Sequence, residues 1–302
     1  MSNKVFFDSG EGYRKQKAWA VPILLLVFFF MGQVLSMVPP IEMGFFTEEE
    51  IETYPTILYM LIAGFGAPLL ILALWLRFGE KRVLASIGML RSSAAKLFAC
   101  GLGLGAGMAS VSVLGIGLAG GYEIETTQDF AAVSYLPILL LALGFIVQSG
   151  VEEILFRGWM LSRLTERYSL WVGVLGNSTL FMLMHLDIAG EEAFHLGDFA
   201  IFVTMTMAFS IFLSFLVIRQ QSIWGACAWH AAWNWSFITW FGLPTTGIVL
   251  DITPLWVDLI MTDNAPNWLT GGSAGPENSV ITTIVLVLSC VLLARIIFHN
   301  RA

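Results

Sequence analysis

Charged residues are scarce in this sequence. Of its 302 residues, 57% are hydrophobic and only 12% are charged, and the mean hydropathy is +0.78. A soluble globular domain carries about 25% charged residues. The composition therefore predicts an integral membrane protein. The net charge of −7 gives no indication of nucleic-acid binding.

Several motifs that would point to other classes of protein are also missing. The cysteines Cys100, Cys227 and Cys290 lie in apolar runs at unrelated spacings, which favours small buried side chains over a disulfide framework or a zinc ribbon. The sequence contains neither the Gly-x-Ser-x-Gly nucleophile motif nor the His-Glu-x-x-His zinc-protease motif. No cleavable signal peptide is expected, because the first apolar run is long enough to span and no small-residue cleavage site follows it. No internal repeat is evident, which weighs against the inverted-repeat transporters.

The glycines do not indicate a nucleotide site. Gly115–Gly120 matches Gly-x-Gly-x-x-Gly, but it ends an apolar run and no strand precedes it. We therefore expect no nucleotide. Gly101, Gly103, Gly105 and Gly107 are instead expected to allow close packing of helices.

Long apolar runs are what the sequence has in abundance. Eight of them approach or exceed the ~20 residues that a bilayer requires. They cover about residues 18–38, 55–76, 97–120, 133–167, 170–186, 199–218, 223–241 and 279–297. Pro39 and Pro40 are expected to end the first, and the long segment 243–278 to contain a short surface helix. We predict one all-α transmembrane domain over residues 18–298, with tails at 1–17 and 299–302.

The charges are sorted between the two sides of this predicted topology. With the N-terminus inside, all 15 Lys and Arg residues fall on the cytoplasmic side or at its edge, whereas 16 of the 22 acidic residues fall outside. Basic residues mark cytoplasmic loops. The sequence therefore predicts about eight spans with both termini in the cytoplasm.

The fourth apolar run carries an unusual group of charges, Glu152, Glu153 and Arg157. A charge within a bilayer costs at least about 2.5–3.5 kcal/mol, so it usually marks a functional site. On a helix, Glu153 and Arg157 lie four residues apart and can pair. Glu152 points about 100° away from that pair. One glutamate is thus expected to be neutralised and the other to be available.

Two further runs carry polar residues, namely His185 on the fifth and His230 with Asn234 on the seventh. Glu152 lies 16 residues before Tyr168 and His185 lies 16 residues after Ser169, so an antiparallel hairpin places both at the same depth, roughly 24 Å from the turn. His230 lies only ~12 Å into its own run. The three runs meet only if the hairpin projects further into the cytoplasm than the 219–222 turn.

These side chains fit hydrolysis of a peptide bond without a covalent intermediate. A carboxylate in a low-dielectric site can act as general base on water. Imidazole and amide groups can hold that water and donate hydrogen bonds to an oxyanion. One Glu and two His are also a catalytic zinc ligand set. A non-catalytic scaffold that keeps the polar cluster to fix its helices, and a transporter or proton relay, remain as further hypotheses.

The motifs Glu152-Glu153-x-x-x-Arg157, Phe181-x-x-x-His185 and His230-x-x-x-Asn234 resemble the three motifs of the CPBP intramembrane proteases. That family includes the CAAX-prenyl endopeptidases of the Ras-converting type and the bacterial Abi, or bacteriocin-processing, group. The resemblance covers about residues 135–240. It implies an eight-helix fold with its site inside the membrane.

The resemblance also implies the role of each motif residue. Glu152 would activate water with the help of His185, His230 and Asn234 would stabilise the oxyanion, and Glu153 and Arg157 would support the site. The family was once described as metalloproteases and is now usually regarded as glutamic-type. No cofactor is therefore expected to be required, and zinc on Glu152, His185 and His230 stays an alternative.

The remaining expectations concern partners and location. The substrate would be a peptide or membrane protein, which in the CAAX enzymes is lipid-modified, and the chain would contact membrane lipid. The sharp charge sorting and the Abi-like motifs favour a bacterial cytoplasmic membrane. Some relatives are thought to act as scaffolds for partner enzymes.

Overall fold

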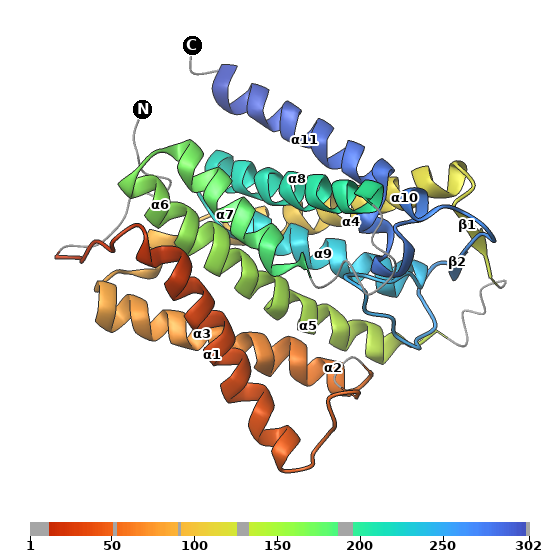
Figure 1. Cartoon of the computed structure of the whole chain (residues 1–302), viewed down its shortest axis with the longest axis horizontal. Helices are drawn as coiled ribbons and strands as arrows, with labels where there is room; N and C mark the ends of the chain where they lie inside the picture. The colour runs from red at the N-terminus through yellow and green to blue at the C-terminus, as the bar shows by residue number, and fades with distance from the viewer. Residues whose placement is uncertain (1–11, 51–52, 90–91, 126–132, 187–195, 300–302) are drawn as a thin grey trace.

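The structure, a computed structural model, describes residues 12–50, 53–89, 92–125, 133–186 and 196–299 (Figure 1). Nearly all of its regular structure is helical, with one pair of short strands. The prediction of an all-α polytopic membrane protein is confirmed. Much of the two expected tails lies outside the described residues.

The helices follow the predicted apolar runs in order. They are α1 (Ala20–Glu42), α2 (Thr56–Tyr59) running on into α3 (Phe65–Leu74), α4 (Ala94–Leu118), α5 (Tyr135–Glu153) running on into α6 (Leu161–Arg167), α7 (Leu170–Met184), α8 (Leu196–Gln220), α9 (Trp224–Phe241), α10 (Asn267–Thr270) and α11 (Val280–His299). The strands β1 (Tyr122–Ile124) and β2 (Leu259–Met261) pair antiparallel. The four-residue α10 is the short helix expected within 243–278.

Six helical segments in the described part of the chain are long and apolar enough to cross a membrane. They are Ala20–Glu42, Thr56–Glu80, Ala94–Leu118, Tyr135–Arg167, Leu196–Gln220 and Val280–Phe298. With 15 residues α7 is shorter than these, and α9 is not among them either. Most of α9, including His230 and Asn234, is buried by other parts of the protein, so it can carry polar side chains away from lipid. The count of eight crossings stays a prediction.

The expectation that Pro39 and Pro40 end the first helix is wrong, because α1 continues to Glu42. A proline lacks the N–H that would bond the carbonyl four residues earlier. The Ser36 carbonyl, left free by Pro40, accepts a hydrogen bond from the Tyr59 hydroxyl at 2.8 Å. A side chain of the next helix thus replaces the missing backbone donor.

Helix α4 packs closely against α9 through two of the glycines singled out above. A Cβ atom at Gly101 would lie 2.4 Å from the Gly225 carbonyl oxygen, and one at Gly105 would lie 2.2 Å from that of Trp229. A Cβ at Gly103 or Gly107 would meet nothing within 4 Å. Gly101 and Gly105, one helical turn apart, therefore let α4 approach the helix that carries His230 and Asn234.

A buried ionic cluster joins the Thr56–Glu80 helix to α6. Glu80 accepts from Arg163 at 2.7 Å and from the Trp159 indole at 2.8 Å, while Arg82 pairs with Glu166 at 2.6 Å. Glu80 and Arg163 are almost completely buried, so each neutralises the other in a low-dielectric setting. The cluster fixes the end of the long helix that contains Glu152.

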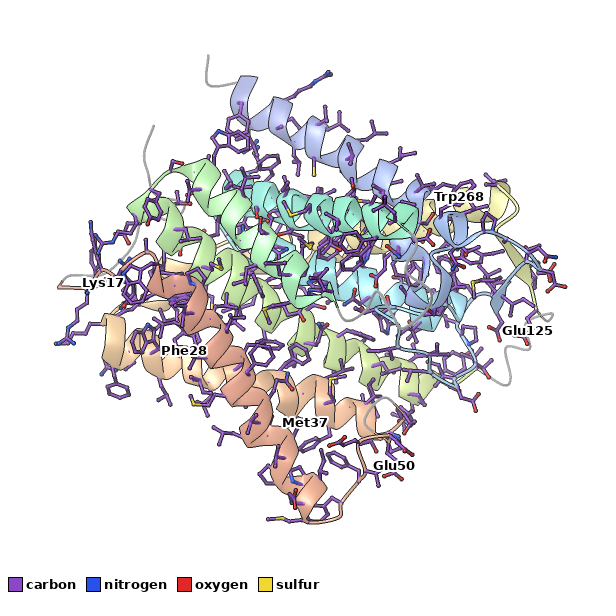
Figure 2. The ribbon with its side chains drawn as sticks, viewed as in Figure 1. Lys17, Phe28, Met37, Glu50, Glu125 and Trp268 are labelled. Atoms are coloured by element: carbon purple, nitrogen blue, oxygen red, sulfur yellow. The ribbon has the colours of Figure 1, made fainter. Side chains whose placement is uncertain are left out.

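The two ends of the molecule differ in charge and in structure. The start of α1, the α6–α7 turn and the end of α11 lie at one end, and β1, β2 and α10 lie at the other (Figure 1). Lys17 and Glu125 mark these opposite ends (Figure 2). The segment between α9 and α11 folds at the second end, and Thr246 and Glu277 within it reach inward to the cavities described next.

Candidate active site

Glu152 and Glu153 are the last residues of α5, where the helix widens into a π-helical turn at Ile154–Met160. Such turns are frequent at functional sites. Glu153 and Arg157 form the ion pair expected from their spacing, with 2.9 Å between Oε1 and Nη1 and both side chains fully buried. The Arg157 guanidinium also lies 4.2 Å from the centre of the Phe181 ring. The charge of Glu153 is therefore compensated.

His230 lies between the two glutamates. Its Nδ1 is 2.9 Å from Glu153 Oε1, and its Nε2 is 3.9 Å from Glu152 Oε2. Because a carboxylate accepts, Nδ1 carries the proton of the shorter contact. The ring is thus oriented with Nε2 toward Glu152, and Phe209 of α8 packs edge-on against it at 4.9 Å.

Asn234 and Glu152 are linked through Gln148. The Gln148 amide donates to Glu152 Oε1 at 2.8 Å, and Asn234 Nδ2 donates to Gln148 Oε1 at 3.3 Å. Asn234 Nδ2 also lies 3.5 Å from the Ser149 hydroxyl. Among the described residues, Glu152 Oε2 has no hydrogen-bond partner. One oxygen of Glu152 is therefore held, while the other is unbound.

His185 directly follows α7, and its orientation is set by the same motif. Its Nδ1 lies 2.7 Å from the Phe181 carbonyl oxygen, and the two rings are 4.3 Å apart. A carbonyl can only accept, so Nδ1 donates and a neutral ring keeps its lone pair on Nε2. Phe181 thereby orients His185 as well as contacting Arg157.

All four expected catalytic residues, Glu152, His185, His230 and Asn234, line one cavity of about 220 Å³. Its other walls are mainly aromatic and aliphatic side chains of α1, the Thr56–Glu80 helix and α5. The structure therefore brings together residues from three predicted runs, including His230. Because they line one cavity, the helix ends have the offset expected from the sequence.

A second, smaller cavity of about 40 Å³ lies on the α8 side of the same residues. It shares His185, His230 and Asn234 with the larger cavity, and Thr246 borders both. Glu277 lines only the smaller one. The three polar side chains thus stand between two spaces of unequal size.

Glu277 is half-buried at this smaller cavity. Burial raises the pKa of its carboxyl, while the hydrogen bond from the Thr246 N–H, the Trp233 indole and His230 act in the opposite direction. Its environment therefore favours the protonated acid more than water does.

The alternative expected from the sequence is zinc on Glu152, His185 and His230. No three His, Cys, Asp or Glu side chains in the described residues are placed to hold one metal ion. His230 Nδ1 is occupied by Glu153, and its Nε2 is 3.9 Å from Glu152. A zinc-bound histidine usually donates its other ring N–H to a carboxylate or a carbonyl, as His230 and His185 do here, so zinc on these three residues stays an alternative.

Residues 133–236 match the family described as type II CAAX prenyl endopeptidase Rce1-like. All seven named residues of the three motifs fall within this match. The chain contains an Rce1-like segment. The resemblance read from the motifs is confirmed. No curated protein matches the chain.

The Rce1-like family implies a CAAX-type intramembrane protease, which is a hydrolase acting on a peptide or protein in the membrane. The matched segment extends from just before α5 into α9. Helices α1, α3 and α4 and the segment 243–278 lie outside it, although they enclose or support the site.

Sequence reasoning missed four residues at the site, Gln148, Ser149, Thr246 and Glu277. Gln148 could have been found, because an amide four residues before Glu152 on an apolar helix shares its face. Thr246 and Glu277 lie in a polar segment between helices, where neither periodicity nor spacing points to an intramembrane site.

Proposed function

We propose that the chain is an intramembrane endopeptidase in which Glu152 activates water. The observation that supports this most directly is the unbound Glu152 Oε2, facing His230 Nε2 at 3.9 Å beside a cavity of about 220 Å³. Glu153 Oε2 also has no hydrogen-bond partner among the described residues, but Glu153 is ion-paired with Arg157 and does not line the cavity.

Hydrolysis would proceed by general base catalysis. Glu152 takes a proton from a water molecule positioned with the help of His185, and the water oxygen bonds to the carbonyl carbon of the substrate. The tetrahedral oxyanion accepts hydrogen bonds from His230 and Asn234. The C–N bond then breaks, and Glu152 returns the proton to the leaving nitrogen.

The environment of the two oxyanion residues agrees with these roles. His230 Nδ1 is held by Glu153 at 2.9 Å, which keeps the ring oriented with Nε2 toward the cavity, where it would donate to the oxyanion. The two Asn234 contacts, at 3.3 and 3.5 Å, are long, so its amide can turn to a substrate at little cost.

The substrate class follows the family match. We propose a membrane protein or peptide, with CAAX-type lipid-modified C-termini as one class to test, and a bacterial cytoplasmic membrane as the location.

The test compares wild type with Glu152→Gln in native membranes by quantitative proteomics of membrane-protein termini. The amide introduced by this substitution has nearly the shape of the glutamate but cannot take the proton from water. C-termini that the wild type generates by cleavage should therefore be missing from membranes with the variant. Glu48→Gln serves as the control, because Glu48 is exposed and does not line the site. This variant should leave the termini unchanged. If Glu152→Gln gives the same termini as wild type and the same partners co-purify with both proteins, the protease proposal is refuted and a scaffold is supported.

A further inference from the structure

Thr246 occupies an unusual position, at the tip of a turn that borders both cavities. Thr245 and Ile248 pair across this turn, with hydrogen bonds of 3.1 and 2.9 Å. Thr246 and Gly247 both have positive φ, at 51° and 79°. Such two-residue turns prefer Asn-Gly, and a β-branched residue with positive φ is an outlier. Gly247 suits the turn, whereas Thr246 does not.

Both backbone amides at the tip are held by the segment before α11. The Thr246 N–H donates to Glu277 Oε1 at 2.5 Å, and the Gly247 N–H donates to the Ala274 carbonyl at 3.2 Å. The Glu277 oxygen can accept this bond whether the carboxyl is ionised or protonated. Glu277 therefore holds Thr246 in its strained conformation.

Glu277 is itself firmly placed. The carbonyl of the preceding Pro276 accepts from the Thr282 hydroxyl of α11 at 2.6 Å. Gly275, with a φ of 100°, lies so close to Pro244 that a Cβ there would be 2.2 Å from the Pro244 carbonyl oxygen. The turn is thus anchored at both ends to the same compact structure.

Strained residues cluster at active sites and ligand clamps, where the surrounding structure maintains them. Asparagine or glycine at position 246 would form this turn without strain. The geometry of the turn therefore does not explain why residue 246 is a threonine. The location of Thr246 does explain it, because Thr246 lines both the larger and the smaller cavity together with His185, His230 and Asn234.

Resting on the proposed function, we propose that Thr246 contacts the substrate next to the scissile bond and determines which residue is accepted there, and that Glu277 is the residue that positions it. Side chains flanking the bond enter the two cavities. The space beside Thr246 and Glu277, of about 40 Å³, is the smaller of the two, so the smaller flanking side chain is expected there and the bulkier one in the space of about 220 Å³.

The experiment sequences the new termini produced by four variants in native membranes. Thr246→Asn suits the turn but changes the side chain. We expect the ratio between cleavage sites that differ in their flanking residues to change about tenfold, which is the effect of one or two groups in a specificity pocket. The melting temperature of the variant should be unchanged. Glu277→Ala should shift the pattern likewise. Glu277→Gln, which retains an acceptor, and Asp263→Asn, an exposed carboxylate of the same segment, should keep the wild-type pattern.

Glu152→Gln is run in parallel to separate this inference from the proposed function. Termini that vanish in Glu152→Gln but keep their flanking residues in Thr246→Asn overturn the specificity role and leave the protease standing. A uniform loss of cleavage at all sites in Thr246→Asn, or failure of that variant to fold, also overturns it. Termini that persist in Glu152→Gln overturn both proposals.

Discussion

Adjacent glutamates with opposite surroundings are the central feature of this protein at the scale of residues. Each is bound through one oxygen, but Glu153 Oε1 accepts from Arg157 and His230, whereas Glu152 Oε1 accepts from the neutral Gln148 amide. Successive residues on a helix point about 100° apart, so one meets the supporting helices and the other the cavity. The proposed function thus gives the same kind of side chain a structural role at Glu153 and a reactive role at Glu152.

Arg157 should be essential for folding rather than for chemistry. In Arg157→Met the buried Glu153 loses its cation, and removing one partner of a buried pair costs about 3–5 kcal/mol. We expect a large drop in the melting temperature of the detergent-solubilised protein. The double variant Glu153→Gln, Arg157→Met should lose less than the sum of the single variants.

Arg219→Met provides the control for this pair, because Arg219 is exposed at the end of α8. It should change stability by no more than about 0.5 kcal/mol. A melting temperature for Arg157→Met equal to that of the control would contradict the role of the buried pair.

Glu277 should make stability depend on pH. Burial raises the pKa of its carboxyl above the usual 4.5, and His230 is the titratable group that faces it. The folded state then binds the proton more tightly than the unfolded state. The contribution of Glu277 is therefore complete below about pH 4.5 and is lost as pH rises through the folded pKa.

Melting temperatures of wild type and Glu277→Gln between pH 4.5 and pH 8 test this. The variant does not ionise, so its melting temperature minus that of wild type should grow more positive as pH rises. A difference that stays constant across this range would show that burial does not perturb Glu277.

At the scale of elements, the site depends on how close α4 comes to α9. In Gly105→Ala the new methyl group would meet the Trp229 carbonyl and push away the helix that carries His230 and Asn234. Overpacking of this kind costs about 1–3 kcal/mol. We expect lower thermal stability and reduced yield of the termini that depend on Glu152.

Gly103→Ala is the matched control on the same helix, since its methyl group would meet nothing within 4 Å. Replacing a mid-helix glycine by alanine favours the helix by about 0.5–1 kcal/mol. Stability should be unchanged or slightly higher. Equal losses in both variants would mean that α4 tolerates neither change for reasons other than contact with α9.

At the scale of the whole molecule, charge sorting predicts which end faces the cytoplasm. Lys17 lies at one end (Figure 2), and Asp263, between β2 and α10, belongs to the other end (Figure 1). In a background with Cys100, Cys227 and Cys290 replaced by alanine, Asp263→Cys in intact cells should react with a membrane-impermeant maleimide. Lys17→Cys should react only after permeabilisation. The reverse pattern would refute the cytoplasmic N-terminus.

The sequence by itself determined the membrane class, the positions of the helical runs and the identity of the motif residues. These properties are local: apolar length reflects bilayer thickness, and charges within apolar runs are too costly to be accidental. The pairing of Glu153 with Arg157 could also be predicted, because four-residue spacing on a helix fixes it.

Only the tertiary structure decided what surrounds those residues. That His230 contacts Glu153 as well as Glu152, that Asn234 reaches Gln148, and that Thr246 and Glu277 border the cavities all depend on contacts between segments far apart in sequence. Even the end of α1 was decided in this way, because the Tyr59 hydroxyl bonds the carbonyl that Pro40 leaves free. Residue spacing carries no information on such contacts, since they arise from packing between helices.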